Sequence, residues 1–210
     1  MADSLVAPSD SPAGSRPEGA ERRASAILAP EAIDLICGFE GYHKRLPDGR
    51  AAPYLCPAYV PTIGYGSIWR ADGTRVTMAD VPITREEAAH LMSREIAAQC
   101  VPAVNRLIVP RLHPLSHGAL VSFTYNLGSG ALKASGLRKA VNDRRWADVP
   151  GELAKWRVAS GRVLPGLIRR REAEAYMFMS GVAKQRAAGD DQGTSVDELA
   201  RWVATVRRAA

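Results

Sequence analysis

The chain has 210 residues and a mass of 22.6 kDa, which fits one compact domain with additional segments. Hydrophobic residues make up 46% of it and charged residues 24%, so disorder of the whole chain is excluded. The formal net charge of +6 favours an anionic partner, such as a nucleic acid, an acidic lipid or an acidic wall polymer, without choosing among them.

Three cysteines are an odd number for a chain of this length and suggest no disulfide framework, so a reducing compartment is expected. The N-terminus shows no basic stretch followed by an apolar one. No stretch reads as a bilayer-spanning helix either. We therefore expect a protein that is held in the cytoplasm without a stable membrane anchor.

The first part of the chain divides into a polar leader and the start of a folded domain. Residues 1–25 are rich in Pro, Ser, Gly and charges, which predicts a disordered leader before a domain at 26–181. Pro30 suits the first turn of a helix that ends at Glu40. Short extended runs follow that helix and predict a small antiparallel hairpin or sheet, around 52–56 and 62–65.

The second part of the chain is predicted to form several separate helices. Thr84 and Glu87 form a capping box that opens a helix with one apolar side. Further helices are predicted at 115–127, which is apolar nearly all round and so buried, and at about 132–142, 147–158 and 166–180. A linker at 182–194 and an amphipathic helix at 195–210 end the chain. The pattern predicts an α+β architecture with a small β-rich lobe in front of a larger helical lobe.

Glu40 is the first candidate for chemistry, because it ends an apolar helix directly before the β-rich segment. A carboxylic acid that is held against apolar surface and keeps its proton near neutral pH can serve as a general acid. A single glutamate at a helix end is more often solvated and without a catalytic task. The assignment therefore depends on what accompanies it.

Two further residues accompany Glu40 at regular spacing. Cys56 follows Glu40 by sixteen residues, and Thr62 follows Cys56 by six. Two short strands joined by a tight turn would place Cys56 beside Thr62. The glycines of the sequence TIGYG, at 64 and 66, would let another chain approach the backbone closely.

These residues, together with segments 120–128 (LVSFTYNLG) and 161–174 (GRVLPGLIRRREAE), occur in an order that resembles the bacteriophage-type lysozymes. These are the endolysins of glycoside hydrolase family 24, and the resemblance covers about residues 28–181. The family's active site is a Glu, then an Asp or Cys, then a Thr in a T-[IV]-G-[YW]-G strand. Those positions match Glu40, Cys56 and Thr62, with a longer loop between the first two than the shortest members have.

The resemblance implies a lysozyme-like α+β fold, with a small β-hairpin lobe packed on a mainly helical lobe and a cleft between them. It implies a muramidase that hydrolyses the β-1,4 bonds between N-acetylmuramic acid and N-acetylglucosamine in peptidoglycan, without a cofactor. Glu40 would protonate the glycosidic oxygen while Cys56 and Thr62 hold the attacking water, which gives inversion. Alternatively, Cys56 would act as a covalent nucleophile, which gives retention.

The resemblance also implies supporting residues. A basic residue of segment 161–174 pairs with the catalytic Glu in the family; Arg170 is the best match and Arg169 the next. We expect Arg170→Ala to reduce turnover more than folding. Asn126 would contact a sugar or cap its helix. Gly64 and Tyr65 would support the substrate.

Two other catalytic interpretations are weaker. His113 and His117 have the spacing of paired metal ligands on a helix, but no third ligand is evident, so no metal is expected. A Cys–His peptidase built on Cys56 and His43 does not suit the strand-like setting of the cysteine.

Two non-catalytic interpretations stay open: a basic module for nucleic acid or acidic membrane, and a lysozyme-like fold that only binds the wall. The first leaves the Glu, Cys and Thr unexplained, and the basic residues are spread along the chain rather than collected in one arm. We therefore expect a monomer that binds peptidoglycan strands and no nucleic acid. By analogy with the family, a holin would release it from the cytoplasm to the periplasm and wall.

Overall fold

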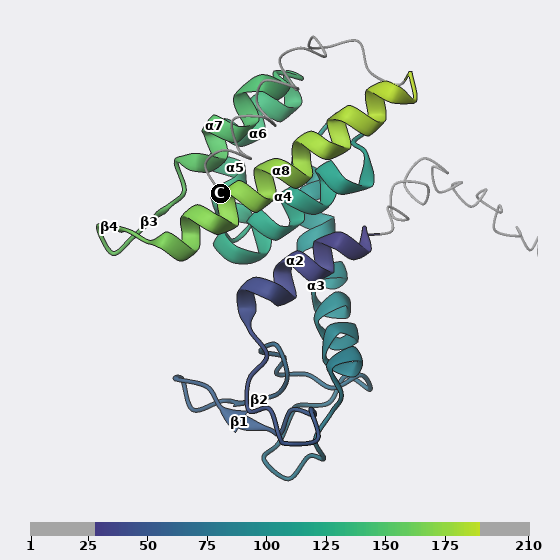
Figure 1. Ribbon diagram of the computed structural model, residues 1–210, viewed down its shortest axis with the longest axis vertical. Helices are drawn as coiled ribbons and strands as arrows, with labels where there is room; N and C mark the ends of the chain where they lie inside the picture. The colour runs from purple at the N-terminus through teal and green to yellow at the C-terminus, as the bar shows by residue number, and fades with distance from the viewer. Residues whose placement is uncertain (1–27, 190–210) are drawn as a thin grey trace, which may run out of the picture.

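The computed structural model describes residues 28–189, which form a small lobe of short strands and loops and a larger lobe of helices (Figure 1). The leader predicted at 1–25 and the amphipathic helix predicted at 195–210 lie outside these residues. The predicted α+β class with two unequal lobes is confirmed.

Helix α2 (Pro30–Glu40) leads into the small lobe, where β1 (Tyr54–Leu55) pairs antiparallel with β2 (Pro61–Thr62). The strands are shorter than predicted, and β2 begins one residue earlier. Isolated bridges and turns make up most of the rest of the lobe. The chain leaves it through α3 (Arg85–Leu107), which runs from the small lobe into the helical lobe (Figure 1).

The capping box predicted for α3 is present. The Thr84 hydroxyl accepts a hydrogen bond from Glu87 N at 3.1 Å, and the Glu87 carboxylate accepts one from Thr84 N at 2.7 Å. Two of the backbone donors at the start of the helix are thereby satisfied without another part of the chain.

The helical lobe is built around α4 (Pro114–Leu127), and the prediction that this helix is buried is confirmed because residues 115–124 are all buried. The other elements of the lobe are α5 (Ser129–Ala134), α6 (Gly136–Asn142), the 3-10 helix η1 (Trp146–Asp148), α7 (Val149–Ala154), β3 (Val158–Ala159), β4 (Arg162–Val163) and α8 (Pro165–Ala187). Helix α8 lies along α4 and packs on it more extensively than on any other helix (Figure 1).

Two predicted helices are wrong in their extent, and local turns explain both. The helix predicted at 132–142 is divided at Ser135, whose hydroxyl accepts from Arg138 N at 3.0 Å and starts α6 as a cap. The helix predicted at 147–158 ends at Ala154. It is followed by the β3–β4 hairpin, in which Ser160 and Gly161 both adopt positive φ, the combination that a two-residue hairpin turn requires.

The predicted linker at 182–194 is wrong for residues 182–187, because α8 continues to Ala187. Gly181 does not end the helix; it lets α8 approach α4, and Val182 beyond it is buried. Within residues 28–189 no helix, α8 included, is both long and apolar enough to cross a membrane.

Charge is distributed unevenly over the fold. Residues 28–128, which include the whole small lobe, hold nine basic and nine acidic side chains. Residues 129–169, from α5 to the start of α8, hold nine basic and three acidic side chains and so carry a net charge of +6. The positive charge is therefore less evenly spread than predicted, because it is concentrated in one part of the helical lobe.

The close approach of α4 and α8 at Gly181 predicts the effect of a methyl group there. A Cβ at this position would lie 2.6 Å from Ser116 N and even closer to Ser116 Oγ. We expect Gly181→Ala to lower the free energy of unfolding by about 1–3 kcal/mol because the two helices must separate. Urea denaturation measures this.

Gly166→Ala is the matched control, since Gly166 belongs to the same helix and a Cβ added to it would have no neighbour within 4 Å. We expect Gly166→Ala to leave stability unchanged or raise it by up to about 1 kcal/mol through helix propensity. Equal effects of the two substitutions would contradict the packing argument.

Candidate active site

Glu40 is the last residue of α2, where Gly41 takes a φ of +80° and donates its N–H to Cys37 O. The Glu40 side chain is partly exposed, and its Oε1 accepts a hydrogen bond from Arg170 Nη1 at 2.7 Å. Oε2 makes no hydrogen bond within residues 28–189. One carboxyl oxygen is therefore held by α8, and the other is left for a ligand.

Arg170 belongs to a buried cluster of charged residues in which the next member is Glu174, four residues along α8. Arg170 Nε lies 3.4 Å from Glu174 Oε1, and the Ser122 hydroxyl of α4 donates to the same oxygen at 2.7 Å. Glu174 is fully buried, and burial raises its pKa, while the guanidiniums of Arg171 and Arg170 oppose the rise. Together these contacts fix Arg170 from three helices, α2, α4 and α8.

Arg171 extends this cluster toward the end of α4. Its Nε lies 3.2 Å from Glu174 Oε2, and its Nη2 donates to Asn126 Oδ1 at 2.7 Å. Arg171 Nη1 is buried without a hydrogen-bond partner among the described residues, but the guanidinium lies over the Phe123 ring, 5.2 Å from its centroid. The Asn126 carbonyl is thus occupied, and contact of its amide NH₂ with a sugar stays a prediction.

Cys56 and Thr62 come together at the β1–β2 hairpin. Cys56 N donates to Val60 O at 3.1 Å and Tyr59 N donates to Cys56 O at 2.8 Å, which closes a tight turn between the strands. Hydrogen bonds from the backbone of Val60 and Ala58, and then from the Thr62 side chain, hold the pKa of the Cys56 thiol below its ordinary value. The turn therefore favours a thiolate.

Thr62 is buried, in contrast to the partly exposed Cys56. Its hydroxyl lies 2.9 Å from Val60 O and also faces the Cys56 sulfur. A hydroxyl has one proton and two lone pairs, so Thr62 can donate to only one of these acceptors at a time and can accept from a third group. A water molecule next to Cys56 is such a group.

Gly64 and Tyr65 have packing roles. Gly64 takes a φ of +63°, and a Cβ on it would lie 2.6 Å from the Cβ of Ala88 in α3. Tyr65 is 6% exposed and its ring packs on Tyr42, with 5.3 Å between centroids. Support of a substrate by either residue stays a prediction.

A pocket of about 760 Å³ lies where the small lobe meets α3, with Ile63, Arg70, Asp80 and His90 in its lining. A second pocket, of about 560 Å³, lies between α2 and α3 beside Tyr65. Neither lining includes Glu40, Cys56 or Thr62. The cleft expected between the lobes therefore stays a prediction.

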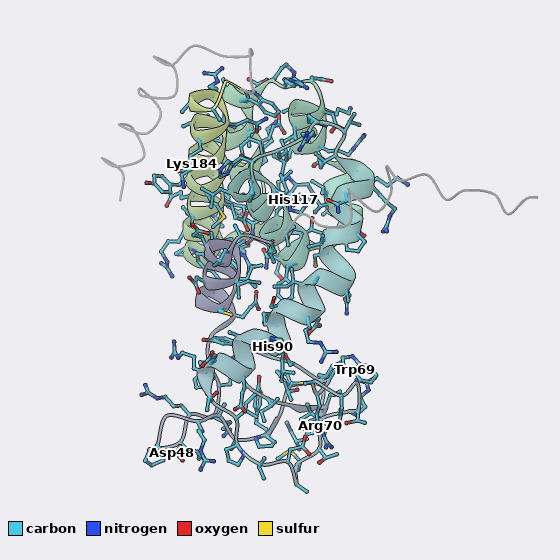
Figure 2. The ribbon with its side chains drawn as sticks, turned by 90° about the vertical axis from the view of Figure 1, so that its right-hand side faces the viewer. Asp48, Trp69, Arg70, His90, His117 and Lys184 are labelled. Carbon is cyan, nitrogen blue, oxygen red and sulfur yellow. The ribbon has the colours of Figure 1, made fainter. Side chains whose placement is uncertain are left out.

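The three histidines considered as metal ligands or as a catalytic base have structural partners. His113 caps α4 by accepting from Leu115 N, and His117, inside the helical lobe in Figure 2, hydrogen-bonds Asn105 Oδ1 at 2.8 Å. His43 bonds Glu40 O at 3.1 Å and packs on the Tyr54 ring. Residues 28–189 hold no group of three or more side chains suited to a metal ion.

No definite role was predicted for three residues of the cluster: Glu174, Ser122 and Arg171, which belongs to the arginine run 169–171 expected to supply the partner of Glu40. The sequence did carry a signal for Arg171 and Glu174. Two arginines are followed by a glutamate at helical spacing, on a helix face that is otherwise apolar. Charges on such a buried face have to be paired with each other. Ser122 gave no signal, since a serine in an apolar helix is common.

Comparison with known proteins agrees with this geometry. The protein-family model "Phage lysozyme" matches residues 39–174. The endolysin of Bacillus phage B103 is 34% identical over 157 residues, 75% of this chain. The chain spans only 56% of the length of that relative.

Two solved structures have the same fold. The endolysin from Escherichia coli O157:H7 phage FAHEc1 is 31% identical with a TM-score of 0.58, and the match covers 72% of this chain and 92% of that one. The muramidase domain of SpmX from Asticaccaulis excentricus is 29% identical with a TM-score of 0.57, covering 72% and 97%.

The buried charge cluster changes the expectation for Arg170. Arg170→Ala leaves Glu174 with one guanidinium instead of two and frees Glu40, so we expect it to lower the free energy of unfolding by about 3 kcal/mol. Arg170→Lys keeps the charge but cannot contact both carboxylates, so its loss should be smaller. Urea denaturation gives both values, and the exposed neighbour Arg169→Ala should leave stability unchanged. Equal stability of the three variants would contradict the cluster.

The cysteines should differ in reactivity. Burial raises the pKa of Cys37 and of Cys100 to about 11, whereas that of Cys56 is lowered. We expect iodoacetamide at pH 7 to modify Cys56 alone in the native protein, with a rate midpoint below that of an unperturbed thiol. Peptide mapping by mass spectrometry identifies the site. Thr62→Val should move the midpoint upward; similar rates at all three thiols would refute the assignment.

Proposed function

The chain belongs to the phage lysozyme family, and from this we propose that it is an endolysin-type muramidase, hydrolysing the β-1,4 bonds between N-acetylmuramic acid and N-acetylglucosamine in bacterial peptidoglycan. One observation carries the proposal. A partly exposed carboxyl, Glu40, is held at one oxygen by a buried guanidinium, so its other oxygen is oriented and left open to a substrate.

In the proposed reaction Glu40 Oε2 carries the proton, because Oε1 is occupied by Arg170. Glu40 gives this proton to the glycosidic oxygen as the bond to C1 of the muramic acid breaks. A water molecule attacks C1 from the opposite face of the sugar ring, so that the new C1–O bond has the inverted configuration.

Cys56 and Thr62 would serve the attacking water. An ordinary thiol is mostly protonated at neutral pH and so is a poor base, but the lowered pKa of Cys56 increases the thiolate fraction. The thiolate accepts one proton from the water while Thr62 orients it. The proton later returns to Glu40 through solvent, which restores the site for the next cycle.

The same thiolate also supports a rival route within the site. As a covalent nucleophile Cys56 would attack C1 itself, and hydrolysis of that intermediate would give net retention. We propose inversion because the Thr62 hydroxyl beside Cys56 supplies a second contact for a water molecule, which a direct attack by sulfur does not need.

The proposed substrate also determines where the protein acts. Peptidoglycan lies outside the cytoplasmic membrane, so a protein held in the cytoplasm has to cross that membrane before it meets the wall. By family analogy a holin provides the passage, and the protein works as a monomer without a resident metal or cofactor.

Glu40→Gln tests the proposal, because an amide has the size of the carboxyl but no proton of suitable acidity. We expect the variant to lose a factor of about 10²–10⁴ in turnover and to lose less stability than Arg170→Ala, because the amide oxygen can still accept a hydrogen bond from Arg170 Nη1. Clearing of chloroform-permeabilised Gram-negative cells, followed as turbidity, and thermal denaturation measure the two effects.

Glu172→Gln, which makes the same change of net charge at an exposed glutamate of α8, serves as the control for handling and for net charge. No clearing by the wild type, or equal clearing by wild type and Glu40→Gln, would refute the muramidase function. Proton NMR of the first anomer formed from a soluble glycan fragment then separates the routes, and initial retention would refute the inverting one.

A further inference from the structure

Tyr59 has an unusual backbone conformation. It is one of four non-glycine residues with positive φ among residues 28–189, at +59°, and the only aromatic one; the others are Lys44, Arg144 and Ser160. Bulky side chains rarely adopt the left-handed region, because Cβ comes too close to the following carbonyl oxygen. Glycine or asparagine would occupy the position with less strain.

The turn itself explains the conformation but not the side chain. Tyr59 N donates to Cys56 O, and Cys56 N donates to Val60 O. These two hydrogen bonds close a turn over residues 56–60, and the positive φ of Tyr59 lets the chain reverse its direction there. Any residue with the left-handed geometry would close this turn. The tyrosine side chain is therefore not selected by the backbone hydrogen bonds.

Packing does not explain it either. Tyr59 is 83% exposed, the highest exposure of the six tyrosines, and its side chain makes no ring contact or hydrogen bond within the described residues. By contrast, Tyr42 and Tyr65 pack on each other, and Tyr54 packs on His43. Neither the backbone hydrogen bonds nor side-chain packing therefore accounts for an aromatic residue at this strained, exposed position.

The location points to the substrate. Tyr59 lies between Ala58 and Val60, the two residues whose backbone groups contact the Cys56 sulfur. Pro57 and Pro61 flank this segment and fix φ on both sides, so the turn is stiff. A ring on a stiff turn next to the site is placed reproducibly and loses little conformational entropy when it binds a ligand.

We infer that Tyr59 is a glycan-binding residue, which lays its ring against the apolar C–H face or the N-acetyl group of a sugar in the strand held at Cys56 and Thr62. Tyrosine supplies a flat apolar surface together with a hydroxyl for hydrogen bonding, as ligand sites require. Strained backbone retained at a functional site is the expected signature of such a role. The inference rests on the proposed muramidase function and adds a specificity contact to it.

Tyr59→Asn separates binding from folding, because the two are expected to change in opposite directions. Asparagine tolerates the left-handed region, so the melting temperature should rise by about 1–3 °C. Loss of the ring should raise KM for soluble glycan strands by about three- to tenfold, with kcat within about twofold. Tyr59→Phe keeps the ring and should hold KM within about twofold of the wild type.

Tyr176→Gln is the matched control, since Tyr176 is a second exposed tyrosine, at 44%, on α8. It should leave KM unchanged. If the wild type cleaves glycan strands but Tyr59→Asn keeps the wild-type KM, the inference is refuted and the muramidase function stands. A fall in melting temperature for Tyr59→Asn would also refute it, since the ring would then stabilise the fold. A wild type that neither cleaves nor binds glycan would overturn both.

Discussion

The fully buried carboxylate of Glu174 is the constraint to which the rest of the site is tied. A carboxylate without exposure to water has to be compensated where it lies, and here two guanidiniums and a serine hydroxyl surround it. Those partners come from α4 and α8, and Arg170 continues to Glu40 on α2. The relative positions of three helices are therefore set by charge compensation in addition to apolar packing, and Glu40 receives its orientation from that arrangement.

The two halves of the site are positioned by different physical means. Glu40 is held by side chains, through a cluster that extends from its carboxyl into the core of the helical lobe. Cys56 is held by the backbone of a short turn, whose N–H groups also alter its acidity. The position of Glu40 is therefore sensitive to substitutions in the core of the helical lobe. The position of Cys56 depends only on the short sequence of its turn. A change in one lobe should therefore leave the other lobe's contribution to the site intact.

Local sequence patterns predicted much of this fold. They did not predict most of the contacts between segments that are distant in the sequence. The end of α2, the capping box at Thr84 and the neighbouring positions of Cys56 and Thr62 follow from residues a few positions apart. Pairing between α8 and Glu40 came only from the family resemblance. The Glu174–Ser122 contact joins residues 52 positions apart, and the β3–β4 turn depends on backbone angles that serine rarely adopts. Single-sequence patterns carry little information on either.

Positive charge is concentrated between residues 129 and 169, so the described part of the protein has a charge asymmetry in addition to its net positive charge. A field from an anionic surface exerts a force on net charge, but on an asymmetric charge distribution it also exerts a torque. For the described residues this torque favours an orientation with the α5-to-β4 part of the helical lobe toward the surface and the small lobe away from it (Figure 1). Because screening limits this torque to about one Debye length, roughly 8 Å at physiological ionic strength, alignment takes place only in the last step of the encounter.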